Sequence, residues 1–468
     1  MKIILVSNRV ARTGGSNGAA GGLATALARA VERRGVVWLG WSGGLSKSDG
    51  HVLPSLSSAG AGTIATVDLP ERHFQSYYNR MSNSALWPLL HNRSDLLTFD
   101  DEALSSYLAV NEFIARAVAR IAGDDSLIWI HDYHFIMVGE YLRRLGFNGP
   151  IGFFLHTPFP GRGTLTCLPH HEKVFRTLLA YDLIGFQTID DQAYFEDYAE
   201  HELGAIRDCR DVLRYGPRSV RLGVFPVGID VEQFARMAAT GLHAPATVQL
   251  RNNLKGAKVV IGVDRLDYSK GLSQRFESYR RFFELYPHEK GRVTFLQITP
   301  PTRSQVSAYQ QVRRQVATLA GDINGRFSDL DWNAVRYLNQ SYSPRTLAGL
   351  YRMSPVACVT PLRDGMNLVA KEYVAAQDPE NPGVLVLSMF AGAARELDAA
   401  LIVNPYDIEN LSRAIEQALS MPVAARRERW AAMMAVLQAN DIEHWYDSFI
   451  NALVQVSASA KLPLAAGA

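Results

Sequence analysis

Short apolar runs alternate with longer amphipathic stretches along most of the chain. The apolar runs of the first half are continuous, which is typical of parallel strands covered on both faces; they are Ile3–Val6, Val36–Leu39, Leu127–Ile130, Ile151–Leu155 and Leu183–Phe186. Helical spacing between them predicts a helix that carries Leu23, Leu27 and Val31 on one side and ends at Gly35. A second helix is predicted from about 135 to 145.

The same alternation restarts in the second half, after Ile229. The predicted strands there are Lys258–Val263, Val293–Thr299, Val335–Asn339, Val356–Thr360, Val384–Ser388 and Leu401–Val403. A chain of 468 residues exceeds what one hydrophobic core usually organises. We therefore predict an α/β protein of two facing, Rossmann-like, doubly wound domains, residues 1–229 and 230–440, with a helix at about 441–468 packing back on the first domain. Ligands of such sheets bind beyond the carboxyl ends of the strands, so we expect the active site in the cleft between the domains.

Composition describes a folded protein without a strong overall charge. Apolar residues make up 47% and charged residues 20%, and the glycines and prolines follow no fixed period, which excludes disorder and collagen. The 48 Lys and Arg against 46 Asp and Glu leave a net charge of +2. No global field would gather nucleic acid or an anionic membrane, so neither is expected as a partner, and any anion must be bound locally.

Cysteine usage and the N-terminal segment both indicate the cytoplasm. Cys167, Cys209 and Cys358 are an odd number and far apart, which suggests neither a disulfide framework nor a thiolate zinc site. The apolar start of the chain is interrupted by Asn8 and Arg9 before a signal peptide or a membrane span could be completed.

A glycine-rich loop follows the first strand. The strand ends in Arg9, and the loop closes with Gly21 and Gly22 at the start of a helix. Bare N–H groups at a helix start can cradle an anion, whereas the alternative is a flexible loop that needs glycine for its turns. The loop contains neither a G-x-G-x-x-G fingerprint nor a Walker lysine, so nicotinamide cofactors and P-loop ATP hydrolysis lose support.

Ionisable side chains follow the third and fourth predicted strands. One strand ends in the stretch His131–His134, and the other is followed by His156. Groups of this kind at neighbouring strand ends are candidates for orienting a polar substrate. A metal site is the rival interpretation, but these histidines and the distant His170-His171-Glu172 complete no known ligand pattern. A structural role for any single histidine remains an equal alternative.

Two basic residues stand in a strand-to-helix loop of the second domain. Arg265 and Lys270 together can neutralise a diphosphate, in place of a divalent metal. The alternative is that they pair with the adjacent Asp264 and Asp267. The stretch Asp329–Asp331 has the D-x-D spacing of metal-dependent sugar-nucleotide enzymes, but its polar surroundings look like a surface loop.

The segment Thr360–Glu372 predicts a strand end, a tight glycine turn and a helix that begins near Asn367. The N–H groups of that helix end suit a nucleotide diphosphate. Asp364 can accept hydrogen bonds from the hydroxyls of a sugar, and Glu372 can accept hydrogen bonds from both hydroxyls of a ribose. An ordinary Asp-Gly turn with an exposed helical glutamate is the alternative.

These segments together resemble the trehalose-6-phosphate synthases, retaining glycosyltransferases of the two-Rossmann-domain GT-B type. The resemblance runs from Lys2 to about Trp445, and it is carried by Ser7-Asn8-Arg9, Gly21-Gly22-Leu23, Tyr77-Tyr78-Asn79, Leu86-Trp87-Pro88, Trp129–His134, Ile151–Pro160, Arg265–Gly271 and Thr360–Gln377. It implies transfer of glucose from UDP-glucose to glucose 6-phosphate, giving trehalose 6-phosphate with the α configuration kept, without cofactor or metal, by a homo-oligomer (dimer or tetramer).

The resemblance also implies roles for single residues. The acceptor phosphate would be held by Arg9, Tyr78 and Arg303, and its sugar by Trp87 and Asp132. The donor would be bound by Gly21, Gly22, Arg265, Lys270, Tyr342, Asp364, Gly365, Met366, Asn367, Leu368, Val369, Ala370, Lys371 and Glu372. The catalytic set would be His156, Asp132, Arg265, Lys270 and Asp364, with His156 near the reacting carbon.

No carboxylate in these segments is obviously placed as a nucleophile, so we expect a front-face reaction without a covalent enzyme intermediate. Thr157, where the family often has Ile, and the unusual loop 161–164 put loop geometry in doubt more than chemistry. The residues leave open UDP, GDP or ADP as the nucleotide and another phosphorylated acceptor, such as glycerol 3-phosphate or a cyclitol phosphate. A non-catalytic sugar-phosphate sensor and, more distantly, a dehydrogenase are the remaining alternatives.

Overall fold

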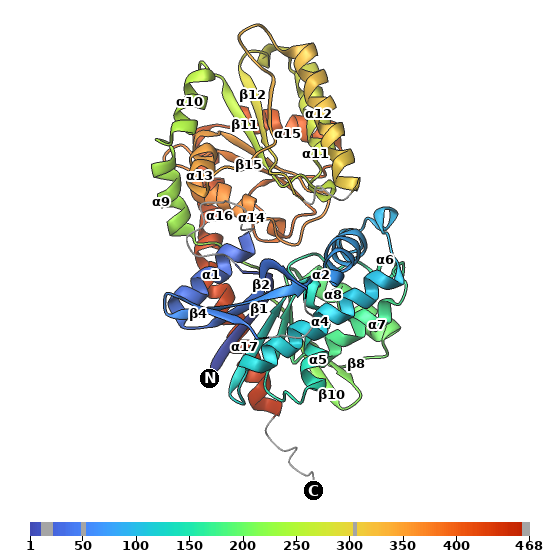
Figure 1. The fold of residues 1–468 in the computed structure, drawn as a ribbon. Coiled ribbons are helices and arrows are strands. Elements are labelled where there is room, and N and C mark those ends of the chain that lie inside the picture. Colours follow the sequence, from blue (N-terminus) through green and yellow to red (C-terminus); the bar gives the residue numbers. More distant parts are fainter. Residues whose placement is uncertain (11–21, 48–52, 303–306, 461–468) are drawn as a thin grey trace. The chain divides into compact units, whose positions relative to one another are not determined.

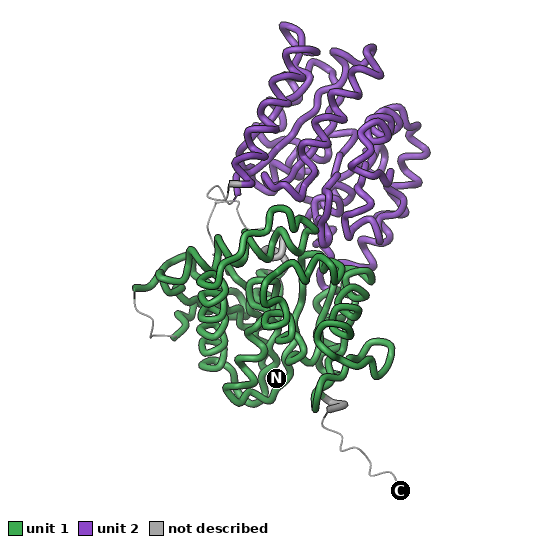
Figure 2. Tube along the Cα trace, turned by 90° about the vertical axis from the view of Figure 1, so that its right-hand side faces the viewer, with its two compact units in different colours: residues 1–15, 20–226, 445–468 green, residues 16–19, 227–444 purple. Residues whose placement is uncertain are grey.

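The computed structural model describes residues 1–10, 22–47, 53–302 and 307–460. The chain divides into two compact units, shown in Figure 2: unit 1 comprises residues 1–15, 20–226 and 445–468, and unit 2 comprises residues 16–19 and 227–444. Each unit is built on a mainly parallel sheet with helices (Figure 1), which confirms the predicted α/β class.

The described residues of unit 1 form a 10-stranded sheet in the order β3-β4-β2-β1-β5-β6-β7-β10-β9-β8. In this order the pairings from β4 through to β10 are parallel. The pairing of β3 with β4 at one edge is antiparallel, and so are the pairings of β10 with β9 and of β9 with β8 at the other. The bounds are β1 (Lys2–Arg9), β2 (Val37–Ser46), β3 (Ser55–Ala59), β4 (Gly62–Pro70), β5 (Ser126–His131), β6 (Ile151–Phe154), β7 (Leu183–Phe186), β8 (Ile206–Cys209), β9 (Val212–Tyr215) and β10 (Arg218–Val224).

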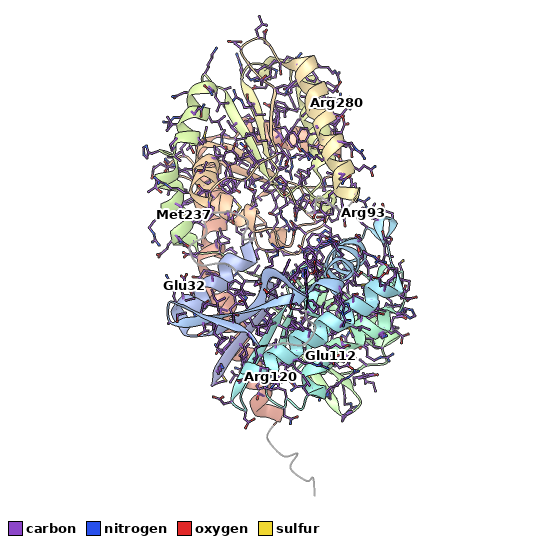
Figure 3. All side chains as sticks on the ribbon, viewed as in Figure 1. Glu32, Arg93, Glu112, Arg120, Met237 and Arg280 are labelled. Carbon is purple, nitrogen blue, oxygen red and sulfur yellow. The ribbon has the colours of Figure 1, made fainter. Side chains whose placement is uncertain are left out.

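Helices of unit 1 cover this sheet and connect its strands. They are α1 (Gly22–Arg34), α2 (Glu71–Phe74), the π-helix η1 (Gln75–Leu86), α3 (Trp87–Leu90), η2 (Ser94–Leu96), α4 (Asp101–Ile121), η3 (Tyr133–Phe135), α5 (Val138–Arg144), α6 (Arg162–Leu165), α7 (His171–Phe175), η4 (Arg176–Ala180), α8 (Ile189–Glu202) and α17 (Ile442–Ala460), which begins in unit 2. On α4, Glu112 and Arg120 (Figure 3) lie outside its buried face, and Asp100 caps the helix by accepting from the N–H of Ala103.

Five strands of unit 1 escaped the sequence prediction, namely β3, β4, β8, β9 and β10. Neither β3 nor β8 is an apolar run, and nearly all their residues are exposed. An apolar-run criterion finds only strands covered on both faces, so polar edge strands are missed. The helix predicted from about 135 to 145 is present as α5, but it begins only at Val138, after the 3-10 turn η3.

The C-terminal helix α17 packs on the sheet of unit 1. The Phe449 ring stacks on Trp129 of β5 with centroids 4.3 Å apart. Gly152 of β6 and Gly185 of β7 leave room for that ring, since a Cβ on either would approach it within 2.8 Å. Glycine at these two buried strand positions therefore serves close helix-to-sheet packing.

In unit 2 the described residues form a six-stranded, wholly parallel sheet in the order β13-β12-β11-β14-β15-β16. This is the 3-2-1-4-5-6 order of a doubly wound nucleotide-binding fold. All six predicted strands of this half are present, as β11 (Lys258–Val263), β12 (Val293–Ile298), β13 (Val335–Leu338), β14 (Val356–Val359), β15 (Val384–Ser388) and β16 (Leu401–Val403).

Helices again connect these strands, and their apolar faces close the core. They are α9 (Val231–Gly241), α10 (Pro245–Asn253), η5 (Tyr268–Lys270), α11 (Leu272–Leu285), η6 (Pro287–Glu289), α12 (Ser307–Phe327), α13 (Pro344–Met353), α14 (Leu368–Ala376), η7 (Gly392–Arg395), α15 (Ile408–Ser420) and α16 (Val423–Ala439). Phe276, Tyr279 and Phe283 of α11 pack on Phe295 and its neighbours in one buried cluster. None of the helices in the described ranges combines the length and the apolar character needed to cross a bilayer.

Candidate active site

An exposed arginine on an aromatic platform stands at the carboxyl end of β1 in unit 1. The Arg9 guanidinium lies 4.4 Å from the ring centroid of Trp41 and 6.0 Å from that of Tyr78. Tyr78 in turn stacks between Phe74, at 5.5 Å, and His134, at 5.9 Å. The rings hold a positive charge in one orientation at the end of the sheet where a ligand is expected.

Two local features place this platform. The Tyr77 hydroxyl, fully buried, donates to Asn8 Oδ1 at 2.9 Å, which ties η1 to the end of β1. Strand β2 continues to Ser46, beyond the predicted Leu39, and Trp41 lies opposite Arg9 in its pairing with β1. Trp41 has no local signal of a functional role, since the apolar run of the predicted strand ends before it.

The loops after β5 and β6 are joined at Asp132. This residue has φ 72°, which is rare for a non-glycine residue. Its N–H donates to Phe154 O at 2.8 Å, and its Oδ1 accepts from the N–H of His156 at 3.3 Å. The surrounding structure therefore holds a strained backbone in place, and such strain gathers at functional sites.

A row of polar side chains links three neighbouring strand ends of unit 1. His131 ends β5, His156 follows β6, and Gln187 follows β7. His131 Nδ1 lies 3.2 Å from His156 Nε2, and Gln187 Nε2 lies 3.5 Å from His156 Nδ1. Burial lowers the pKa of His156 to about 3, and burial followed by the neighbouring His156 lowers the pKa of His131 well below its usual value. Both rings are therefore neutral near pH 7.

Trp87, the expected wall for the acceptor sugar, is 6% exposed at the start of α3. Its ring packs 4.1 Å from that of His91 and 5.5 Å from that of Tyr133. The Tyr133 hydroxyl donates to Asn83 Oδ1 at 3.0 Å. Tyr133, which follows Asp132 in the loop after β5, thus packs against Trp87 and holds it near that loop.

In unit 2, Lys270 and Asp364 meet from two separate loops. Lys270 Nζ lies 2.5 Å from Asp364 Oδ2, and Asn367 Nδ2 donates to the same oxygen at 2.9 Å. Lys270 is 7% exposed, whereas Arg265, in the same loop, is exposed. Gly271, with φ 64°, lets this loop touch the other, since a Cβ there would lie 2.3 Å from Thr360 O.

The loop that carries Asp364 is fixed by backbone hydrogen bonds to the segment before η7. The Asp364 N–H donates to Phe390 O at 3.1 Å, and the Gly392 N–H donates to Asp364 O at 3.1 Å. A Cβ at Gly392 would lie 1.8 Å from Gly365 O, so only glycine fits. Asn367, with φ 73°, is the last residue before α14, which leaves the first N–H groups of this helix to face a ligand.

A buried arginine lies beneath both loops. Arg275 of α11 is fully buried, and its Nη1 donates to Asp264 Oδ2 at 2.5 Å, its Nε to Thr360 Oγ1 at 2.9 Å and its Nη2 to Lys270 O at 3.3 Å. It connects the ends of β11 and β14 with the backbone of Lys270. Arg275 could not be recognised from the sequence, because an arginine four residues into a helix looks like a surface residue.

Two charged residues of α14 have different surroundings. Burial raises the pKa of Glu372 to about 7. Lys371 is fully buried, and its Nζ donates to Val227 O at 2.8 Å and to Glu396 Oε2 at 2.6 Å. The Lys371 ammonium is therefore engaged within unit 2, so a contribution to donor binding would come from its backbone.

Of the four remaining residues expected in the site, the structure describes two. Gly21 and Arg303 lie outside the described residues, and Gly22 begins α1. Tyr342 follows the edge strand β13, where its hydroxyl accepts from Gln340. The described contacts thus bring Arg9 to Tyr78, Asp132 to His156, and Lys270 to Asp364 and Asn367.

Metal-ligand groupings of the described residues lie elsewhere. One group of three such side chains, His288, Glu289 and Glu416, belongs to η6 and α15. Asp331 of the D-x-D stretch pairs with Lys255 at 3.1 Å, and its neighbour Leu330 is wholly exposed, as expected for a surface loop.

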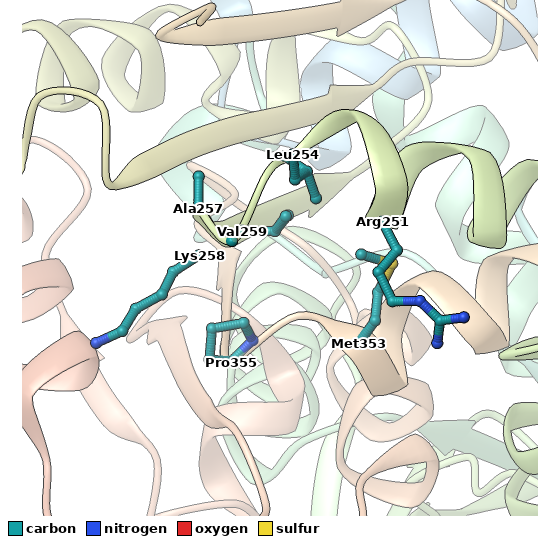
Figure 4. Close-up of a pocket in the computed structure, with 8 residues that line it drawn as sticks. Arg251, Leu254, Ala257, Lys258, Val259, Met353 and Pro355 are labelled. Carbon is teal, nitrogen blue, oxygen red and sulfur yellow. The ribbon is translucent and has the colours of Figure 1, made fainter.

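A pocket near Lys258 lies at the wrong end of the sheet for the site. It is lined by residues that include Arg251, Met353 and Pro355 (Figure 4). Lys258 begins β11, whereas Asp264 follows its carboxyl end. The pocket is therefore at the opposite end of the strand from the Lys270 loop.

The model of glycosyltransferase family 20 matches residues 7–455. The chain belongs to this family. The match spans every residue group described above, in both units, and it agrees with the resemblance seen in the sequence motifs.

Members of family 20 are similar to this chain over nearly its whole length. Escherichia coli trehalose-6-phosphate synthase is 43% identical over 458 residues, 97% of this chain and 95% of that protein. A UDP-forming alpha,alpha-trehalose-phosphate synthase from Burkholderia vietnamiensis has 45% identity and a TM-score of 0.95, with 98% of each chain covered.

Two solved structures similar to this family 20 chain contain ligands. The Burkholderia xenovorans alpha,alpha-trehalose-phosphate synthase (UDP-forming), in complex with glucose 6-phosphate, has 43% identity and a TM-score of 0.93 over 97% of this chain and 100% of its own. An E. coli structure bound with UDP-2-fluoro glucose has 43% identity and a TM-score of 0.92 over 97% of this chain and 99% of its own.

Proposed function

We propose that this chain transfers glucose from UDP-glucose to glucose 6-phosphate, giving trehalose 6-phosphate and UDP. The observation that carries the proposal is the meeting of Lys270, Asp364 and Asn367 at the start of α14, which offers an ammonium, a sugar-binding carboxylate and open helix N–H groups together. The ligands of the B. xenovorans and E. coli relatives support the choice of acceptor and donor.

The proposed acceptor residues are in unit 1. Arg9, oriented by Trp41 and Tyr78, would pair with the phosphate, for which a guanidinium offers a planar set of donors. Trp87 and Asp132 would contact the sugar ring and its hydroxyls. Arg303 completes the proposed set from outside the described residues.

The proposed donor residues are in unit 2. Arg265 and Lys270 would bind the diphosphate together with the N–H groups of Leu368 and Val369, and Asp364 to Asn367 would hold the glucose. The carboxylate of Glu372 would accept both ribose hydroxyls. Tyr342 and the glycines at 21 and 22 are proposed as further donor contacts.

We propose a front-face reaction with retention of configuration. The bond between the glucose anomeric carbon and the UDP phosphate oxygen breaks, and the anomeric oxygen of the acceptor forms the new bond from the same face. The proton of that acceptor hydroxyl passes to the departing phosphate oxygen, so no enzyme carboxylate is needed as a nucleophile. Arg265 and Lys270 would stabilise the negative charge that grows on the leaving group.

Alanine substitutions of Arg265 and Lys270, the two residues proposed to bind the diphosphate, test this function. We expect Lys270→Ala or Arg265→Ala to lower turnover about a hundredfold or more while the fold survives, as for loss of one oxyanion donor. UDP release from UDP-glucose is measured with glucose 6-phosphate, glycerol 3-phosphate or a cyclitol phosphate as acceptor, and GDP-glucose and ADP-glucose are compared as donors. Lys255→Ala, which removes an exposed ion pair with Asp331, is the control.

Two outcomes of this assay would refute the proposal. Near-normal turnover in both Arg265→Ala and Lys270→Ala would contradict the roles assigned to these two residues. Absence of UDP release with glucose 6-phosphate, or a strict need for added divalent cation, would remove the proposed reaction.

We further propose a cytoplasmic homo-oligomer. The three cysteines, two exposed and one buried, are all free thiols, which suits a reducing compartment. Light scattering of the purified protein measures the subunit number, and a monomer at working concentration would refute the oligomer.

A further inference from the structure

His131 is a buried titratable residue to which the proposed reaction gives no task. It is 0% exposed, and its ring packs 4.5 Å from that of Trp129 and 6.1 Å from that of Trp445. Its Nδ1 faces His156 Nε2 at 3.2 Å. Its Nε2 has no hydrogen-bond partner among the described residues.

One proton lies between the two rings, and its position decides the tautomer of both. If His131 donated, its own Nε2 would be a bare lone pair buried against aromatic rings, and His156 Nδ1 would carry a proton towards the Gln187 amide nitrogen. If His156 donates, the Nε2–H of His131 points among aromatic rings, whose faces accept such donors weakly. His156 Nδ1 is then a lone pair that can accept from Gln187 Nε2, 3.5 Å away. The second arrangement leaves fewer groups unsatisfied.

We propose that His131 is a positioning residue, whose Nδ1 accepts the Nε2–H of His156 and thereby holds His156 as one neutral tautomer in one orientation. The inference rests on the proposed function and on the expectation from the sequence that His156 lies near the reacting carbon. His156 Nε2 is then engaged by His131, and His156 Nδ1 is a lone pair 3.5 Å from Gln187 Nε2. The His156 side chain therefore serves as a fixed wall of the site and not as a proton carrier.

The neighbouring contacts favour a fixed rather than an adaptable ring. His131 is paired with Phe154 in the register of β5 and β6, and the N–H of His156 donates to Asp132 Oδ1 at 3.3 Å. The His156 ring is thus held from beneath by His131, and its backbone is held by Asp132. A shift of about 1 Å in such a group can lower turnover about a hundredfold.

Matched substitutions separate the hydrogen bond from packing. His131→Asn keeps an acceptor oxygen at about the place of Nδ1, whereas His131→Phe keeps the ring and removes the acceptor. We expect His131→Phe to lower kcat about 10- to 100-fold with KM for both substrates within about twofold, and His131→Asn to retain most of kcat. His171→Phe, which deletes the 2.7 Å contact of His171 Nδ1 with the Tyr198 hydroxyl, is the control and should leave kcat unchanged.

The nitrogen spectrum of histidine-labelled wild-type protein reports the tautomers directly and needs no substrate. We expect both His131 and His156 as Nε2–H tautomers, assigned by loss of their signals in the variants. An Nδ1–H tautomer of His156 would overturn the proposal, as would unchanged kcat in His131→Phe or equal loss in His131→Asn. If His131→Phe fails to fold, the wild-type spectrum decides. If the wild-type protein transfers no glucose, the proposed function fails, and the tautomers still confirm or refute the hydrogen bond.

Discussion

Lys270 and Asp364 form an ion pair in unit 2, with Nζ 2.5 Å from Oδ2, and both side chains are largely buried. The same carboxylate oxygen accepts from Asn367 Nδ2. In the proposed reaction Lys270 binds the diphosphate and Asp364 binds the glucose. When UDP-glucose binds, its diphosphate must therefore share the Lys270 ammonium with the Asp364 carboxylate.

Asp364→Asn should separate nucleotide binding from turnover. Removing the carboxylate frees Lys270 for the diphosphate and removes a nearby negative charge, so we expect UDP to bind about three- to tenfold more tightly, a change of about 1 kcal/mol. Turnover should fall at least about tenfold, because the neutral amide offers the sugar hydroxyls one acceptor oxygen in place of two charged ones. Titration calorimetry with UDP and a UDP-release assay measure the two effects.

Asp331→Asn is the matched control for that substitution, since it removes a carboxylate from an exposed ion pair of the same unit. Neither UDP affinity nor turnover should change in it. Weaker UDP binding by Asp364→Asn would show that the carboxylate organises Lys270 for the phosphate and does not compete for it.

UDP binding should depend on pH through Glu372. Burial raises its pKa to about 7, so the carboxyl is largely protonated below that value in the free protein. Ribose hydroxyls donate to the ionised form, so binding favours loss of the proton. We expect UDP affinity to rise up to about tenfold between about pH 6 and about pH 8, following the ionised fraction.

Glu372→Gln supplies the comparison for this pH dependence. The amide does not ionise, so its UDP affinity should vary less across the same interval. A profile in Glu372→Gln as steep as that of the wild type would assign the titration to another group.

Lys371 should contribute strongly to the stability of unit 2. Its buried Nζ bridges Val227 O, at the point where the chain enters unit 2, and Glu396 Oε2, while Glu396 Oε1 accepts from Asn440 Nδ2. Lys371→Met leaves the Glu396 carboxylate without its cation, so we expect a loss of about 3 kcal/mol in the free energy of unfolding.

The double variant Lys371→Met/Glu396→Gln removes the unpaired charge and should recover part of that loss. Denaturant unfolding of the single and double variants measures the coupling. Equal stability of wild type and Lys371→Met would show that the buried ammonium has no net effect.

Arg9 should depend on Trp41 for its orientation. Trp41→Leu removes the ring that lies 4.4 Å from the Arg9 guanidinium, so we expect KM for glucose 6-phosphate to rise about three- to tenfold, with kcat less affected. KM for UDP-glucose is the internal control and should stay constant. A variant that alters both KM values equally would indicate a general loss of structure.

The structure shows why some strands are readable from sequence and others are not. Strand β11 is a run of apolar residues because helices cover both of its faces, and its predicted bounds are those observed. Strand β8 is exposed along its whole length and carries no such run. The edges of a sheet are set by pairing partners distant in the chain, which local pattern does not report.

Some residues of the candidate site can likewise be recognised from the sequence, and others cannot. Arg265, Lys270 and Asp364 could be predicted as candidates because they lie in the loops that follow apolar strands, where ligands of such sheets bind. Trp41, Arg275 and Gln187 could not, since each looks locally like an ordinary strand, helix or loop residue.

The sequence by itself determined the α/β class, the parallel strands of both cores and the loops of the candidate site, because burial on two faces and the turn after a strand leave local marks in the chain. The tertiary structure alone decided which side chains meet. Lys270 pairs with Asp364, 94 positions away, and His131 with His156, 25 positions away, because parallel pairing brings the carboxyl ends of neighbouring strands to one edge.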